Sequence, residues 1–135
     1  MSGGGLVIKL APKERVLINS AVIENGDRAA RICIRTPGAN ILRLSDALHP
    51  KQATTPVTRT VYLCQMILSG DLEPAAGRRQ LLRAIEELSQ VFADRDSVTL
   101  LDRATAGVLA GNDYAALKAL RGLIPREARL LGLLQ

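Results

Sequence analysis

The sequence predicts an α+β protein, in which a small antiparallel β-sheet or barrel-like unit precedes a bundle of about four helices. Before residue 50, short apolar runs follow a period of two; after it, apolar residues recur at helical spacing. Gly, Pro and Asn punctuate the runs. We expect a β unit over residues 1–50 and a helical unit over 51–135, packed together as one compact protein.

The β unit is predicted from apolar runs at 6–10, 15–24, 28–35 and 40–44, the second interrupted at Asn19-Ser20. Asn25-Gly26 is the residue pair most typical of a type I′ hairpin turn, so we expect a hairpin there. Residues 36–38, Thr-Pro-Gly, mark the next turn. In the run 28–35, the period of two places the arginines on one face and the isoleucines on the other.

The helical unit is predicted from start and stop signals. Ser45-Asp46 can cap a single turn, which His49-Pro50 would end. Thr55 followed by Pro56 begins the first long helix, and Gly70 ends it.

Three further helices are expected. Pro74 opens one whose apolar positions extend to Phe92. Asp96 or Ser97 begins the next, with Val98, Leu101, Val108 and Leu109 apolar and Gly111 at its end. Asn112 caps a fourth that continues to Pro125, with Tyr114, Leu117, Leu120 and Ile124 facing inward. Residues 126–135 form either a further half-helix or a tail.

The net charge of +5 is confined to the first part of the chain. Residues 1–60 carry nine basic and four acidic side chains, whereas residues 61–135 carry nine of each. A basic surface attracts phosphate-bearing partners, so an RNA-binding function is favoured for the β unit.

No catalytic or metal-binding pattern stands out, and we expect neither an enzyme nor a cofactor. His49, the one histidine, has no cysteine or acidic partner at ligand spacing and is interpreted as a loop residue. The acidic pairs Glu86-Glu87 and Asp94/Asp96 are interpreted as solvated helix faces and caps. Because only three aromatic residues are present, all expected in helices, an aromatic base-stacking platform is excluded.

The expected compartment is the cytoplasm. Cys33 and Cys64 lie among apolar neighbours and outside any paired motif, so we expect two buried, reduced thiols. The N-terminus lacks the features of a signal peptide, and the apolar stretches are too short for a membrane span.

RNA contact would therefore depend on basic side chains, backbone groups and shape. The alternative is that these side chains form an ordinary solvated sheet face. The candidate RNA-binding residues are Lys9, Lys13, Arg15, Arg28, Arg31, Arg35 and Arg43.

Three strings, in order, resemble the flagellum biosynthesis repressor FlbT family of flagellated alphaproteobacteria. They are KERVLINSAVIENGDR (13–28), ATTPVTRTVY (53–62) and GNDYAALKALRGLI (111–124). The resemblance extends from about Leu6 to Ile124. It departs from the family at Lys13, where glycine is usual, and at Ala115, where a large residue such as tyrosine is usual.

The resemblance implies a post-transcriptional repressor of flagellin synthesis. Such a protein acts through the 5′ untranslated region of flagellin mRNA and promotes its degradation, leaving cleavage to a cellular nuclease. It also implies contact with flagellin and with the flagellar regulator FlaF.

A weaker resemblance links the β unit, through IRTPGANILRLSDAL (34–48), to the carbon-storage regulator CsrA, an RNA-binding homodimer. The position of that family's RNA-contacting arginine falls on Ser45, so the contact does not transfer, and Arg43 would point to the other face. Homodimerisation is left open.

A competing interpretation is a protein-binding adaptor or flagellin chaperone that affects the message indirectly. Its basis is the leucine-rich helical unit, which could leave a groove for an amphipathic helix. The alternative for those leucines is core packing.

Overall fold

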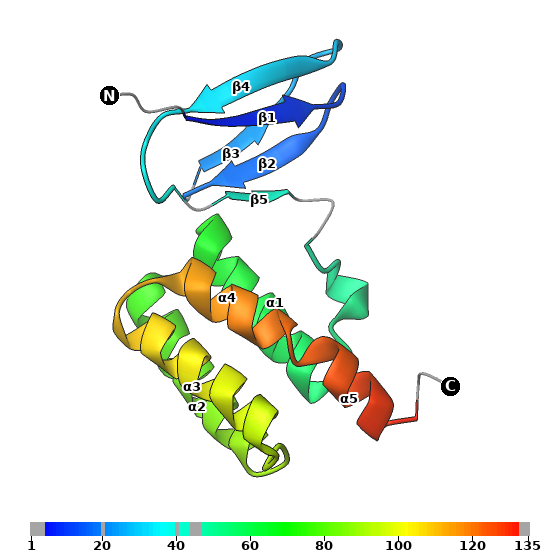
Figure 1. Ribbon diagram of the computed structural model, residues 1–135, viewed down its shortest axis with the longest axis vertical. Helices are drawn as coiled ribbons and strands as arrows, with labels where there is room; N and C mark the ends of the chain where they lie inside the picture. The colour runs from blue at the N-terminus through cyan, green and yellow to red at the C-terminus, as the bar shows by residue number, and fades with distance from the viewer. Residues whose placement is uncertain (1–4, 20, 40, 44–46, 133–135) are drawn as a thin grey trace. The chain divides into compact units, whose positions relative to one another are not determined.

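The computed structural model describes residues 5–19, 21–39, 41–43 and 47–132. It divides the chain into two compact units, Met1–Ala47 and Leu48–Gln135, with strands in the first and helices in the second (Figure 1). The predicted α+β fold is confirmed. The packing of the two units against each other stays a prediction.

The β unit contains two antiparallel sheets. Strand β1 (Leu6–Leu10) pairs with β4 (Ala30–Ile34), and the pairs run from Leu6 opposite Ile34 to Leu10 opposite Ala30. In the other sheet, β2 (Arg15–Ile18) lies between β3 (Ala21–Glu24) and β5 (Ile41–Arg43) (Figure 1).

The core of the β unit joins the two sheets. Ile8 and Leu10 from β1 pack with Val16 from β2. Partly buried isoleucines complete this cluster at positions 18, 32, 34 and 41. The predicted alternation in β4 is confirmed, because Ile32 and Ile34 pack against the core while Arg31 is exposed.

The predicted hairpin at Asn25-Gly26 is wrong. β3 pairs with β2, with Ile18 opposite Ala21, and Asn19 directly after β2 has a φ of 56°. Asn25 instead lies where the chain passes from one sheet to the other. Its side-chain amide donates to the carbonyl oxygens of Ala11 (2.8 Å) and Arg28 (2.9 Å), so it holds this crossing in place.

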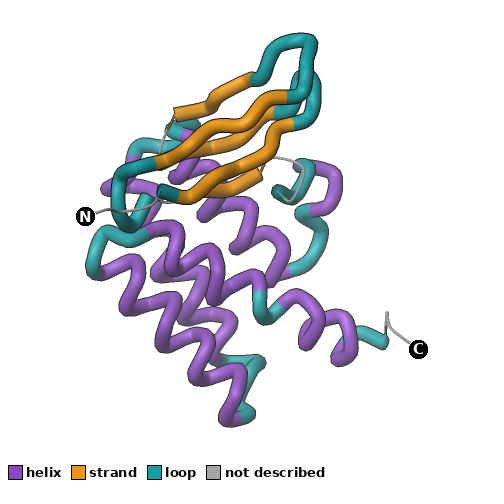
Figure 2. Tube along the Cα trace, turned by 45° about the horizontal axis from the view of Figure 1, so that its top comes forward, coloured by secondary structure: helices purple, strands orange, loops and turns teal. Residues whose placement is uncertain are grey.

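The helical unit begins with a 3₁₀ turn, η2 (Pro50–Gln52), followed by α1 (Pro56–Ser69), α2 (Pro74–Ser89) and α3 (Arg95–Leu109). It ends with α4 (Asp113–Arg121) and the short α5 (Ile124–Leu130). Helices α1 to α4 each contact the next, and α4 also contacts α1, which closes a four-helix bundle (Figure 2). α5 contacts α1. The bundle core includes Val61, Leu81, Leu101, Leu117 and Leu120.

Several predicted caps are confirmed. Thr55 and Thr58 form a capping box at the start of α1, with Pro56 in the first turn. Gly70 ends α1 with a φ of 86°, a left-handed conformation that glycine adopts without a steric penalty. The side chain of Asn112 caps α4.

Other boundaries differ from the prediction. His49 caps η2 instead of ending a turn, while Ser45 and Asp46 lie outside the described residues. α3 begins at Arg95, just before the predicted start at Asp96 or Ser97, because the carboxylate of Asp94 accepts the backbone N–H of Ser97 and caps the helix there. α4 ends at Arg121. Pro125 lies in the first turn of α5, where the N–H that proline lacks would have no partner within the helix.

Three apolar residues of the predicted helices lie outside a helix or outside the core. α2 ends at Ser89, so the buried Phe92 lies just beyond it and not within a helix. Val98 and Leu109 in α3 are 38% and 71% exposed and lie outside the core.

No described helix combines the length and the apolar character that crossing a bilayer requires.

Candidate nucleic-acid interface

The ribbon formed by β1 and β4 presents one basic face. Residues opposite each other on paired strands project to the same side, and Lys9 stands opposite Arg31 while Val7 stands opposite Cys33. All four are exposed, and the reverse side carries the core residues Ile8 and Ile32. The exposed Arg35 continues the alternation one residue beyond β4.

Lys9 and Arg31 form a like-charge pair. Two cations directly opposite each other destabilise a ladder unless an anion lies between them. Neither side chain has an ion pair or hydrogen bond among the described residues, and the same holds for Arg28 and Arg35. We refer to Lys9, Arg28, Arg31 and Arg35 as the unpaired cations.

The other three candidate residues are held by acidic partners. The Lys13 ammonium lies 2.9 Å from an Asp27 carboxylate oxygen, and Arg15 lies 2.8 Å from Glu24. The guanidinium of Arg43 donates to Glu14 and also to the carbonyl oxygen of Lys9, at 2.8 Å. Each acidic side chain described in the β unit is thus matched to one basic side chain.

The Arg43 contact fixes the end of β5 to β1 and to the turn that follows it. Glu14 also accepts the backbone N–H of Ala11 at 2.8 Å. This backbone hydrogen bond and then the guanidinium of Arg43 lower the pKa of Glu14. Arg43 is therefore positioned to stabilise the unit, whereas the unpaired cations are open to solvent.

The prediction of two buried thiols is wrong for Cys33, which is exposed, whereas Cys64 is buried. The alternation that placed the arginines already implied this result, since Cys33 lies between Arg31 and Arg35 at a period of two. Burial raises the pKa of the Cys64 thiol to about 12, and the negative charge of the nearby Asp113 also raises it.

In the helical unit, the most buried charged groups join helices. Asp113 at the start of α4 is 8% exposed and accepts two hydrogen bonds from Arg78 of α2, at 2.9 and 2.6 Å. Glu127 of α5 accepts the backbone N–H of Val57 at 2.9 Å and the hydroxyl of Thr55. These groups connect helix ends and require no ligand to complete them.

Among the described residues, no group of three or more His, Cys, Asp or Glu side chains is arranged to hold a metal ion. His49 accepts the backbone N–H of Lys51 through Nδ1, at 3.1 Å, which gives this histidine a capping role in η2.

Comparison with known proteins points to one family. The family model described as "Flagellar protein FlbT" matches residues 6–131. A "Probable flagellum biosynthesis repressor protein FlbT" of Rhodopseudomonas palustris is 35% identical over 127 residues, which cover 93% of this chain and 97% of the relative. One of the same name from Allorhizobium ampelinum is 34% identical over 130 residues, covering 93% and 83%.

The "Flagellum biosynthesis repressor protein FlbT" of Caulobacter vibrioides is 30% identical over 129 residues, covering 94% of this chain and 89% of the relative. No solved structure matches the chain significantly.

Proposed function

This chain belongs to the FlbT family of flagellar proteins, and on that premise we propose that it is a post-transcriptional repressor of flagellin synthesis. It binds the 5′ untranslated region of flagellin mRNA and promotes degradation of the message. Contacts with flagellin and with FlaF, and a cytoplasmic location, belong to the same proposal; a homodimer stays open.

The observation that carries the RNA-binding part is the set of unpaired cations on and beside the β1–β4 ribbon. Phosphate contacts supply most of the affinity of non-specific RNA binding and require accessible positive charge. The like-charge pair of Lys9 and Arg31 gains most from a phosphate, because an anion between them removes their repulsion. Of the seven candidate residues, we propose that these four make the direct contacts.

The three matched residues have a supporting role in this proposal. Lys13, Arg15 and Arg43 would have to leave a carboxylate to reach a phosphate. The pairs of Lys13 and Arg15 are exposed, and a surface ion pair is weak, about 0–1 kcal/mol, so their exchange has a small cost but reduces the gain from each contact. Arg43 is held more firmly, because the Glu14 side chain is only 14% exposed and Arg43 also donates to the carbonyl oxygen of Lys9.

Degradation is assigned to a cellular nuclease. General acid–base or metal-assisted cleavage needs titratable groups that converge on one point. The buried acids described above already accept hydrogen bonds from protein donors. The proposed role is thus to hold or expose the message.

The proposal is tested by a gel-shift titration of the purified chain against the 5′ leader of its own flagellin mRNA. An unrelated leader of equal length serves as the control, and both are run at two salt concentrations. We expect a shift of the flagellin leader at lower protein concentration than the control, with affinity that weakens as salt rises.

Equal affinity for both leaders, or none for either, contradicts direct recognition. A shift that appears only after flagellin is added would favour the adaptor interpretation, in which the message is affected indirectly.

A further inference from the structure

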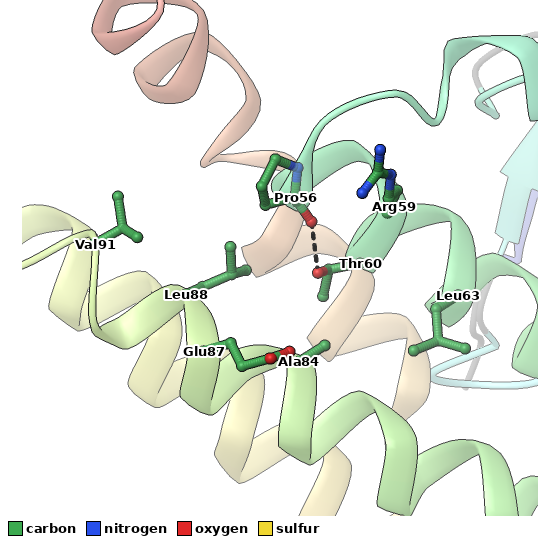
Figure 3. Close-up of a pocket in the computed structure, with 8 residues that line it drawn as sticks. All are labelled: Pro56, Arg59, Thr60, Leu63, Ala84, Glu87, Leu88 and Val91. Atoms are coloured by element: carbon green, nitrogen blue, oxygen red, sulfur yellow. Dashed lines mark hydrogen bonds between the residues drawn. The ribbon is translucent and has the colours of Figure 1, made fainter.

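An open groove lies between α1 and α2 in the helical unit. Its volume is about 420 Å³. Three residues line it from α1, namely Pro56, Thr60 and Leu63. Facing them are Ala84 and Leu88 of α2 and Val91 just beyond it (Figure 3).

The two sides of the groove have the same spacing. Each set of three residues follows the pattern i, i+4, i+7, which places its members along one stripe of a helix. The early part of α1 faces the late part of α2, as expected for consecutive helices joined by a short connection. Two parallel stripes with this spacing form the surface on which a third helix packs its side chains.

The floor of the groove accepts apolar side chains without leaving a donor unsatisfied. The hydroxyl of Thr60 donates to the carbonyl oxygen of Pro56 at 2.7 Å, the bond drawn in Figure 3. Val91 is 64% exposed, so the groove is open to solvent at that end. A partner that covered it would remove apolar surface from water.

Opposite charges flank the groove. Arg59 lines the α1 side and Glu87 lines the α2 side, and both are exposed. Among the described residues they do not form an ion pair with each other. A helix in the groove would therefore be favoured by an acidic residue on one flank and a basic residue on the other.

None of the helices described in this chain would supply such a helix from a second copy. Among the described helices, the exposed large apolar residues are Val98 and Leu109 in α3 and Leu130 in α5. The two in α3 are separated by three turns that carry no other exposed large apolar residue, and α5 has only 7 residues. Neither helix exposes an apolar stripe at i, i+4, i+7.

We propose that this groove binds one amphipathic helix of a different protein, with apolar residues at i, i+4 and i+7, an acidic flank toward Arg59 and a basic flank toward Glu87. The contact covers about two helical turns, roughly 10 Å. The site is on the helical unit and is independent of RNA binding by the β unit.

The test uses fluorescent synthetic helices of about 16 residues, a length at which helicity in water becomes appreciable. All carry the same leucine stripe. One has glutamates on one flank and lysines on the other, a second has glutamates on both flanks, and a third has lysines on both. The mixed helix can bind in either direction, because turning it end for end exchanges its flanks. The two uniform helices therefore show which charge each rim prefers.

With the full chain, fluorescence anisotropy should show the tightest binding for the mixed helix. In Glu87→Lys both rims are positive, and preference should move by about threefold or more toward the all-glutamate helix. In Arg59→Glu both rims are negative, and preference should move by a similar factor toward the all-lysine helix.

Ala84→Arg places a charged side chain in the groove and should weaken binding of every helix by about tenfold or more. Leu109→Arg adds the same charge at a residue 71% exposed and outside the groove, and it should bind like the parent chain. Circular dichroism confirms that each variant folds.

The proposal is overturned if Ala84→Arg binds as the parent does, or if the rim variants do not change flank preference. It is also overturned if sedimentation shows that Ala84→Arg dissociates a dimer, because the occupant is then a second copy. RNA gel shifts of the same variants test the proposed RNA binding separately, because that binding does not depend on the groove.

Discussion

At the scale of single residues, the basic side chains of the β unit differ by their partners more than by their positions in the sequence. Glu14, Glu24 and Asp27 each hold one of them, and these contacts fasten strands and turns together. The unpaired cations have no such role among the described residues. The proposed RNA-binding function therefore rests on the unpaired cations.

Lys13 has a backbone conformation that disfavours residues other than glycine. Its φ is 63°, in the left-handed region, which costs an ordinary residue about 1–2 kcal/mol. The family resemblance places glycine at this position, and the structure gives the physical reason. The N–H of Lys13 donates to the carbonyl oxygen of Gly26 at 2.8 Å, and this bond does not depend on the side chain.

We therefore predict that Lys13→Gly stabilises the protein by about 1 kcal/mol, although it removes the exposed pair with Asp27. Urea denaturation measures the change. Lys13→Ala is the matched control, since it removes the same ion pair and keeps the backbone strain; it should be neutral or slightly destabilising. Equal stability of the two variants would contradict the role given to the backbone.

At the scale of elements, helix ends were predicted well because their signals are local. Thr55-Pro56, Gly70 and Asn112 each act within one turn of their own position. Strand pairing depends on residues distant in sequence, and the Asn25-Gly26 hairpin failed for this reason. β3 was already paired with β2, so the asparagine could serve the crossing between sheets instead.

The cap of α3 provides a prediction at this scale. The carboxylate of Asp94 accepts the N–H of Ser97 at 3.0 Å and lies 3.2 Å from Arg126. The neighbouring Ser97 side chain and N–H, and then Arg126, lower the pKa of Asp94. Because the pKa of Asp94 is lowered in the folded state, its carboxylate stabilises the protein at pH values above the pKa of unfolded aspartate, about 4. This stabilisation is lost as the pH falls through the pKa of the folded state.

Asp94→Ala should therefore lower the thermal unfolding midpoint by a few degrees at pH 7, because the N-cap is lost. Asp94→Asn keeps an acceptor for Ser97 and should lose less. Midpoints measured from pH 7 to pH 2 should show the parent approaching the asparagine variant as acid protonates the carboxylate. A constant difference across this range would exclude the charge of Asp94 as its source.

At the scale of the whole molecule, chemistry is divided between the two units. The charge excess of residues 1–60 lies mainly on the β unit, and the groove with opposite rims lies on the helical unit. A protein that holds a message with one unit and a partner helix with the other can act without a catalytic centre. This arrangement agrees with a regulatory role for a member of the FlbT family.

The candidate site was predicted in part at this scale. Composition located the basic unit, and the alternation of Arg31 and Arg35 predicted which face of the ribbon is exposed. The sequence did not show that Arg15 is ion-paired and Arg31 is not. Ion pairing depends on which acid lies opposite, and Glu24 reaches Arg15 only through the pairing of β2 with β3. The groove was anticipated on leucine-rich faces, but Leu63 and Leu88 share it with proline, threonine, alanine and valine.

If the unpaired cations bind the RNA phosphates, removing them must change how strongly binding depends on salt. Affinity for the flagellin leader should be measured across a salt series for Arg31→Ala/Arg35→Ala and for Lys13→Ala/Arg15→Ala. Both double variants remove two positive charges, but only the first removes unpaired ones. For each phosphate that the protein no longer neutralises, the slope of log affinity against log salt becomes shallower by roughly 0.7.

The slope should be shallower by roughly 1.4 for the first variant and little changed for the second. An equal change in both variants would mean that the RNA is attracted by net charge and not by this face of the β1–β4 ribbon.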